Sequence, residues 1–211
     1  MSRVKNFAPV LVIGVFALFG GIFWIHGSFV TGHRISESVG RYGTVGTLQS
    51  DFNVSGMQLA DWRWMREISA VRLTTVKGKI VPFPTNRPVL IVASWCPYCA
   101  KTLTLLQETN LLDKVQLVGA GNSYVPEVVN SSDPLQKAKT NMKVKLDQLG
   151  IDVSLNQILL ALPKNGLDSL VHGYPTLLVP RDGMWYVKQG YVADKSFWFK
   201  ALASHADEAG R

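Results

Sequence analysis

VLIVASWCPYC, residues 89 to 99, contains both cysteines of the 211-residue chain at the end of an apolar run. Cys96 and Cys99 have the CxxC spacing. The run from Val89 to Ala93 is short and bounded by a proline, which predicts a strand buried on both faces. Pro97 favours the first turn of a helix. The stretch therefore predicts a strand, a loop with two cysteines and a helix.

A CxxC pair can belong to a metal site, a structural disulfide or a redox couple. A structural zinc site needs four ligands, usually two such pairs or one pair with two closely spaced histidines, and the four histidines of this chain are scattered. A disulfide across so short a loop removes little entropy from the unfolded chain. The pattern favours redox chemistry, with no metal and no cofactor other than the Cys96 and Cys99 pair itself.

The two cysteines are expected to have different roles. Cys96 falls at the start of the predicted helix, where unpaired backbone N–H groups and the helix dipole stabilise a thiolate. It is therefore the predicted nucleophile. Cys99 lies one helical turn further on and can resolve a mixed disulfide on Cys96.

A second segment, Gly173 to Thr176 with the sequence GYPT, precedes the short apolar run Leu177 to Val179. By itself it also fits an ordinary turn before a strand. Together with WCPYC after a buried strand, it makes the chain resemble the thioredoxin superfamily. The resemblance implies that Pro175 is cis and faces the cysteines, and that the backbone of Tyr174 pairs with an extended stretch of substrate. The residues around Cys96 that it implies for substrate binding are Trp95, Pro97 and Tyr98.

The remaining patterns fit an α/β, thioredoxin-like fold, a central mixed sheet flanked by helices. Residues 72 to 76 and 115 to 118 have the length and composition of strands. Asp182-Gly183 stands between two strand-like runs, which predicts a hairpin. Asp194 can cap a final helix. The resemblance extends over residues 72 to 204.

Cys96 and Pro175 lie 79 positions apart, more than in a minimal thioredoxin, so an insertion is expected over about residues 122 to 170. Apolar residues recur there at helical intervals, with Ser154 as an expected N-cap of the second series. We therefore predict a helical insertion. Similar insertions occur in exported oxidoreductases resembling the TlpA and ResA group or the DsbA group. The first series is Leu135, Ala138, Met142, Leu146 and Leu149, and the second is Leu155, Ile158, Leu159 and Leu162.

The N-terminal residues predict the compartment. Residues 7 to 25 are 19 uncharged residues, nearly enough to cross a hydrocarbon core of about 30 Å as a helix. Arg3 and Lys5 precede them, which places residues 1 to 6 in the cytoplasm and the rest outside. The run is longer than that of a usual cleaved signal, and no A-x-A pattern follows. We therefore expect an uncleaved, single-pass signal anchor rather than a cleaved signal.

Residues 26 to 68 are expected to form an extracytoplasmic spacer, and residues 69 to 211 the thioredoxin-like domain. The spacer has several Gly, Ser and Thr residues and no clear period. Near its end, Trp62, Trp64, Met65 and Ile68 predict a short amphipathic element. Such an element either packs on the domain or lies at the lipid interface.

These features predict a membrane-anchored thiol-disulfide oxidoreductase acting on the extracytoplasmic side. Its expected partners are exported proteins with thiols or disulfides and a membrane or exported redox partner, and no nucleic-acid motif is found. Two alternatives stay open. One is a binding or assembly factor whose cysteines are idle. The other is a copper-delivery protein of the same fold, which His172 near the site favours and the absence of a wider CxxxC spacing disfavours.

One position departs from the family pattern. Thioredoxins share a carboxylate six positions before the first cysteine, and this carboxylate helps to deprotonate the resolving cysteine. Leu90 occupies that position here. Cys99 would then lose its proton to water, to a groove residue or to the substrate. The direction of exchange, reduction, isomerisation or oxidation, depends on the reduction potential of the pair.

Overall fold

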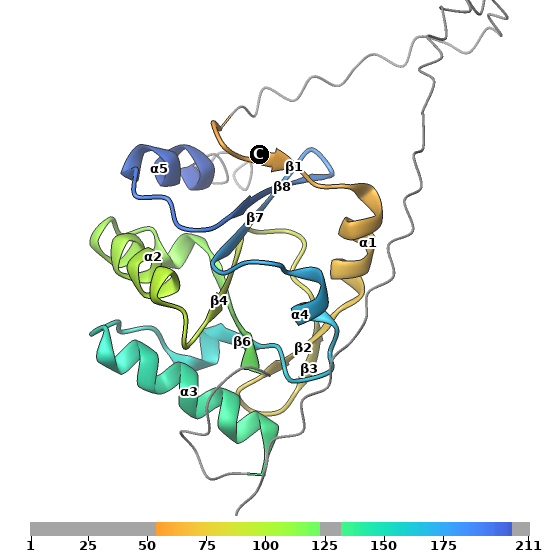
Figure 1. Cartoon of the computed structure of the whole chain (residues 1–211), viewed down its shortest axis with the longest axis vertical. Helices are drawn as coiled ribbons and strands as arrows, with labels where there is room; N and C mark the ends of the chain where they lie inside the picture. Colours follow the sequence, from red (N-terminus) through yellow and green to blue (C-terminus); the bar gives the residue numbers. More distant parts are fainter. Residues whose placement is uncertain (1–53, 123–131, 204–211) are drawn as a thin grey trace, which may run out of the picture. The chain divides into compact units, whose positions relative to one another are not determined.

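The computed structural model describes residues 54–122 and 132–203, which form one mixed sheet with helices on both faces (Figure 1). The strand order is β1-β8-β7-β4-β5-β6-β2-β3. The strands are β1 (Gln58–Leu59), β2 (Arg72–Thr75), β3 (Ile80–Pro82), β4 (Val89–Ala93), β5 (Gln116–Ala120), β6 (Ile158–Leu160), β7 (Thr176–Arg181) and β8 (Met184–Gln189). The helices are α1 (Trp62–Ala70), α2 (Pro97–Glu108), α3 (Pro134–Gln148), α4 (Leu167–Leu170) and α5 (Lys195–Ala203), with short 3₁₀ turns at Leu112–Lys114 and Leu155–Gln157.

The strand before the cysteines lies at the centre of the sheet. β4 pairs in parallel with β5 and antiparallel with β7, and all five of its residues are buried. Val89 and Ile91 pack into the core on one face, whereas Leu90 and Val92 pack into the core on the other. The prediction of a strand buried on both faces is therefore confirmed, and the strand fixes the start of α2 at the middle of the domain.

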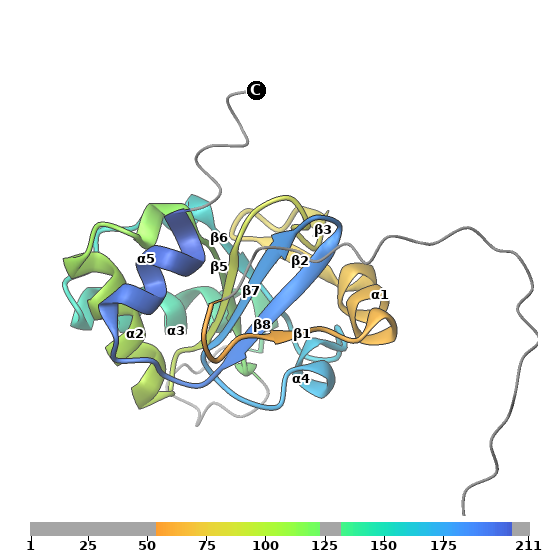
Figure 2. The ribbon, with the colours of Figure 1, turned by 90° about the horizontal axis from the view of Figure 1, so that it is seen from above.

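The helices divide between the two faces of the sheet. Figure 2 shows α2, α3 and α5 on one face and α1 and α4 on the other. Each face has its own core, one with Leu103 of α2 and Met142 of α3, the other with Ile68 of α1 and Leu167 of α4. This double layer covers the parallel part of the sheet on both sides, as such sheets require.

The C-terminal half follows the sequence-based expectation. β7 and β8 form a hairpin in which Arg181 pairs with Met184, and the two turn residues, Asp182 and Gly183, have φ of 50° and 72°. Positive φ at both turn positions is the geometry that an Asp-Gly step favours. Asp194 accepts a hydrogen bond from the backbone N–H of Ser196 at 2.8 Å, at the start of α5. The predicted hairpin and the predicted cap are both confirmed.

The insertion differs from the prediction in its second half. The first apolar series forms α3, which buries Ala138, Met142 and Leu146. The second series does not form a helix: Ser154 caps only a 3₁₀ turn, and Ile158–Leu160 is strand β6. β6 lies between β5 and β2 and pairs with both. Three consecutive apolar residues fit a buried strand as well as a helix. Here β5 and β2 offer unpaired backbone groups on either side, and pairing with them stabilises the strand. The helical insertion is thus a helix followed by a strand and the short α4.

The expected boundary at residue 69 lies too late in the chain. β1, within the predicted spacer, pairs with β8, and α1 begins at Trp62 after the N-cap Asp61. Ile68 is fully buried, and the indole N–H of Trp64 donates to the carbonyl of Leu170 at 2.9 Å. The amphipathic element therefore packs on the domain. A two-residue strand such as β1 has no periodic signal of its own, so the sequence does not reveal that the domain begins before residue 69.

The predicted signal anchor at residues 7–25 lies outside the described residues. Within residues 54–122 and 132–203, every helix is too short or too polar to cross a membrane.

Candidate redox site

Cys96 is the N-cap residue of α2. Its backbone is extended, and the backbone N–H of Cys99 donates to its Sγ at 3.3 Å. Pro97 stands in the first turn, where its missing N–H costs no helical hydrogen bond. Both cysteines are free thiols in this structure. The sulfur of Cys96 thus lies at the helix start, where N–H groups and the dipole favour a negative charge.

Cys99 has a different environment. Its side chain is fully buried in the core between the sheet and α2, and its Sγ accepts a hydrogen bond from the backbone N–H of Ala93 at 3.4 Å. Burial raises the pKa of the Cys99 thiol far above its ordinary value, although the Ala93 N–H opposes part of that rise. Leu90 is fully buried in the same core. The β4 position that holds a carboxylate in thioredoxins therefore supplies no proton acceptor to Cys99.

The segment that begins β7 lies directly against Cys96. The Tyr174-Pro175 peptide bond is cis, as the resemblance implied. The thiol of Cys96 donates to the carbonyl oxygen of Tyr174 at 3.5 Å. The rings of Trp95 and Tyr174 meet edge to face, with centroids 5.9 Å apart. The cysteine loop and the proline loop are thus in contact through both backbone and rings.

A cavity of about 590 Å³ opens beside Cys96. Five of the seven predicted site residues line it, and the other two, Cys99 and Pro175, are buried. The predicted site residues that line the cavity are Trp95, Cys96, Pro97, Tyr98 and Tyr174. Gly173 of the GYPT segment and His172 also line it, together with Asp168 and Val171, which no motif singles out.

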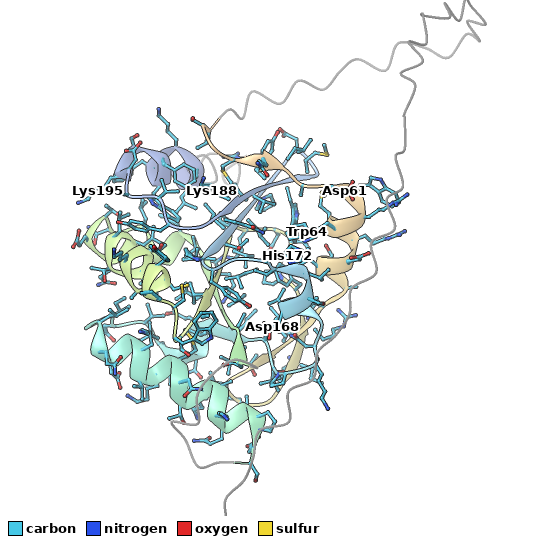
Figure 3. The ribbon with its side chains drawn as sticks, in the orientation of Figure 1. Asp61, Trp64, Asp168, His172, Lys188 and Lys195 are labelled. Carbon is cyan, nitrogen blue, oxygen red and sulfur yellow. The ribbon has the colours of Figure 1, made fainter. Side chains whose placement is uncertain are left out.

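Asp168, labelled in Figure 3, links three segments of the site through hydrogen bonds. Its Oδ1 accepts the backbone N–H of Gly121 at 3.0 Å and the hydroxyl of Tyr174 at 2.9 Å. Gly121 in turn accepts the indole N–H of Trp95 at 3.0 Å. Asp168 lies in the four-residue helix α4, and a lone acid in a short polar stretch has no pattern by which the sequence could reveal it.

On the side of α2, the rings of Tyr98 and Tyr191 are stacked with centroids 6.5 Å apart. The Nζ of Lys101 lies 5.7 Å from the first ring centroid and 5.9 Å from the second. Tyr98 is 54% exposed and Trp95 is 43% exposed. Exposed aromatic rings therefore flank the reactive sulfur on two sides.

In the described part of the chain, no three His, Cys, Asp or Glu side chains are grouped as ligands of a metal ion. His172 comes from the turn after α4 (Figure 3) and is exposed on the rim of the cavity. The arrangement around Cys96 is thus that of two thiols, a peptide carbonyl and aromatic rings, which suits sulfur exchange on a polypeptide.

No family model matches the chain, and no curated protein does. Among solved structures, it is similar to MTB dsbF at 17% identity, with a TM-score of 0.43 and coverage of 65% of this chain and 96% of that one. A candidate thiol:disulfide interchange protein DsbE from Chlorobium tepidum is 14% identical, with a TM-score of 0.44 and coverage of 66% and 95%. A secreted Mycobacterium tuberculosis disulfide oxidoreductase is 17% identical, with a TM-score of 0.40 and coverage of 68% and 99%.

Because these identities and TM-scores are low, the assignment of the fold rests on the chain's own strand order and site geometry. β4-α2-β5 is a βαβ unit, β7-β8-α5 is a ββα unit, and the two join along the β4 and β7 edges. The CxxC pair stands at the start of α2, opposite the cis proline. The protein has a thioredoxin-like fold with a CxxC pair at its centre, and its structural neighbours are thioredoxin-like thiol:disulfide oxidoreductases.

Proposed function

We propose that this protein is a membrane-anchored thiol-disulfide oxidoreductase that exchanges disulfides with exported proteins through Cys96 and Cys99. The observation that carries the proposal is the asymmetry of the pair. Cys96 lines an open cavity and accepts an N–H at the helix start, whereas Cys99 is fully buried one turn further on. A nucleophilic sulfur that lines an open cavity, backed by a fully buried resolving thiol, is the arrangement that disulfide exchange needs.

In the reducing direction, the Cys96 thiolate attacks one sulfur of a substrate disulfide. The S–S bond of the substrate breaks, a Cys96–substrate disulfide forms, and one substrate thiolate leaves and takes up a proton. Cys99 then loses its proton and attacks the Sγ of Cys96, which releases the second substrate thiolate. The pair ends as a Cys96–Cys99 disulfide, oxidised by two electrons, and the substrate gains those two electrons. Oxidation of a dithiol follows the same steps in reverse.

The Tyr174 loop supports a polypeptide substrate. Its carbonyl oxygen lies within hydrogen-bonding distance of the Cys96 sulfur, so a strand of substrate that pairs with this backbone brings its own sulfur to Cys96. Trp95, Pro97 and Tyr98 are exposed around that point and offer contact area to such a strand. These residues are therefore the proposed substrate-binding surface, together with Tyr174 and Pro175.

The membrane anchor and the exported location belong to the same proposal. They are supported by the uncharged run at residues 7–25 and by the two basic residues, Arg3 and Lys5, before it. An exported domain with a reactive thiol pair encounters proteins whose disulfides are being formed or rearranged. The cellular redox partner would act on the same Cys96–Cys99 pair.

The function is tested with the full-length protein in detergent, using insulin reduction and the refolding of scrambled ribonuclease. Replacing Cys96 with serine should abolish both activities, while Thr102→Ser, a conservative change on the same helix, should leave them near the wild-type level. Equal activity of Cys96→Ser and the wild type would instead favour a binding factor with idle cysteines.

A further inference from the structure

Tyr174 is held at three points around the redox site. Its carbonyl oxygen accepts from the Cys96 thiol at 3.5 Å, and its ring meets that of Trp95 edge to face with centroids 5.9 Å apart. Its hydroxyl donates to Oδ1 of Asp168 at 2.9 Å. These contacts reach two other parts of the chain, the cysteine loop and α4. The place of the Tyr174 backbone beside Cys96 therefore depends on residues outside its own loop.

Asp168 is tied to the centre of the sheet. Its Oδ1 also accepts the backbone N–H of Gly121, the residue after β5, at 3.0 Å. The carbonyl oxygen of Gly121 accepts the indole N–H of Trp95 at 3.0 Å. Gly121 has a φ of +68°, and a Cβ there would lie 3.0 Å from the Cβ of Ala93, so glycine permits this close approach. The Tyr174 hydroxyl is thus fixed, through one carboxylate oxygen, to the end of β5.

The bond to Asp168 differs from another contact that holds the same loop. The Thr176 hydroxyl donates to the carbonyl of Gly173 at 2.6 Å, which closes the loop on itself. The bond to Asp168 joins the loop to α4 instead, and a carboxylate acceptor makes it stronger than a bond between neutral groups. A substrate strand that pairs with Tyr174 is placed by the position of that backbone, and small displacements of reacting atoms cost much of the rate. A fixed Tyr174 therefore matters most to a polypeptide substrate.

We propose that Asp168 is a positioning residue, which holds the Tyr174 carbonyl beside Cys96 so that polypeptide disulfides react faster than small disulfides without peptide groups. The proposal rests on the proposed function and deepens it, since it names the determinant of a preference for polypeptides. Asp168 acts here as the acceptor for the Tyr174 hydroxyl, so an uncharged oxygen in the same place retains most of the effect. A small disulfide needs only access to the Cys96 sulfur, which lines the open cavity, and gains nothing from an aligned backbone.

The test compares two uncharged disulfides: the symmetrical disulfide of a short neutral peptide with one cysteine and blocked ends, and bis(2-hydroxyethyl) disulfide. Reduced full-length protein in detergent reacts with each in a single turnover, and the thiols released are quantified by chromatography. The readout is the preference, defined as the second-order rate constant for the peptide divided by that for the small disulfide. Because every variant meets the same two disulfides, their intrinsic reactivities cancel between variants.

Tyr174→Phe removes the hydroxyl and keeps the ring, and it should lower the preference about tenfold, as should Asp168→Ala. In both variants the rate with the small disulfide should stay within about twofold of the wild type, because that reaction needs no aligned backbone. Asp168→Asn keeps an oxygen that can accept from Tyr174, and its preference should stay within about threefold of the wild type. The double variant with Tyr174→Phe and Asp168→Ala should match Asp168→Ala alone, since both changes remove the same bond.

The matched control is Ser169→Ala, which removes a hydroxyl of α4 that donates to the Gly166 carbonyl at 2.7 Å and should leave the preference unchanged. A wild-type preference in Tyr174→Phe would overturn the proposal. So would an equal fall in both rates, because a bond that only stabilises the fold affects both disulfides alike. Losses that multiply in the double variant would show that the hydroxyl and the carboxylate act separately, contrary to the proposal.

If Asp168→Ala does not fold, Tyr174→Phe, which removes a single oxygen, decides the question. Failure of the proposed function is a separate result, because then the wild type and Cys96→Ser react alike with the small disulfide.

Discussion

The thiol of Cys96 donates to the carbonyl oxygen of Tyr174 across 3.5 Å, joining the start of α2 to the loop before β7. This contact places the reactive sulfur beside a backbone carbonyl that could also pair with a substrate strand. Cys99 has no such access, since it is fully buried behind the helix start.

Alkylation of the reduced, folded protein should be selective for Cys96. Iodoacetamide near neutral pH should add one group per chain, found by peptide mass spectrometry at Cys96, because thiolates react and burial keeps Cys99 protonated and inaccessible. In denaturant both cysteines should react. Preferential labelling of Cys99 in the folded protein would reverse the proposed roles.

The stability of the reduced protein should fall in alkali because of Cys99. Burial raises the pKa of this thiol in the folded state above the ordinary value of 9.0. Above that pH the unfolded chain has lost the proton while the folded state retains it, so the unfolded state binds fewer protons and stability decreases as pH rises. The contribution of Cys99 is complete below pH 9 and is lost as pH increases towards its folded pKa.

The measurement is urea unfolding of the reduced protein and of Cys99→Ala at several pH values above 9. The free energy of unfolding of the wild type should decrease relative to the variant by up to about 1.4 kcal/mol per pH unit. Parallel dependences of stability on pH for the two proteins would show that burial does not keep Cys99 protonated in the folded state.

Gly121→Ala should destabilise the protein more than Gly183→Ala. Both glycines have positive φ, and an alanine in that region costs about 1 to 2 kcal/mol. At Gly183 a Cβ meets nothing within 4 Å, whereas at Gly121 it approaches Ala93 and Trp95. The first variant should therefore lose about 1 to 3 kcal/mol more than the second, by overpacking. Equal losses in thermal unfolding would mean that the close approach at Gly121 relaxes freely.

A carboxylate at position 90 should speed the resolving step. Leu90 and Cys99 are fully buried in the same core, so Leu90→Asp places a proton acceptor there, and Leu90→Asn is the matched neutral control. Both should cost roughly 3 kcal/mol or more in stability, since a buried polar group replaces leucine. Stopped-flow release of substrate from the mixed disulfide should be at least about tenfold faster in the aspartate variant. If the two variants release substrate equally fast, proton removal from Cys99 does not limit resolution.

The centre of the fold could be predicted because its signals are local. A five-residue apolar run before the cysteines, proline in the first helical turn and an Asp-Gly step each specify their own geometry. These signals predict β4, the start of α2 and the turn between β7 and β8, whereas β7 and β8 each extend one or two residues beyond the predicted apolar runs. Cys96 as the N-cap residue follows from the same local pattern.

The features that the sequence does not reveal depend on partners far away in the chain. Ile158–Leu160 is a strand because β5 and β2 leave room for it in the sheet, and nothing in its own apolar spacing excludes a helix. Residues 58–59 join the sheet only through β8, over a hundred positions later. Asp168 is positioned by hydrogen bonds from Gly121 and Tyr174, which belong to two other segments. Such pairings arise from tertiary structure.

The most direct test of the assigned roles is to trap the mixed disulfide. Reduced full-length Cys99→Ala and Cys96→Ala are each incubated with insulin, and the products are separated on non-reducing gels and mapped by mass spectrometry. Cys99→Ala should accumulate a disulfide between Cys96 and insulin, because the resolving thiol is absent, while Cys96→Ala should form almost none. A mixed disulfide that forms through Cys99 as readily as through Cys96 would contradict the account.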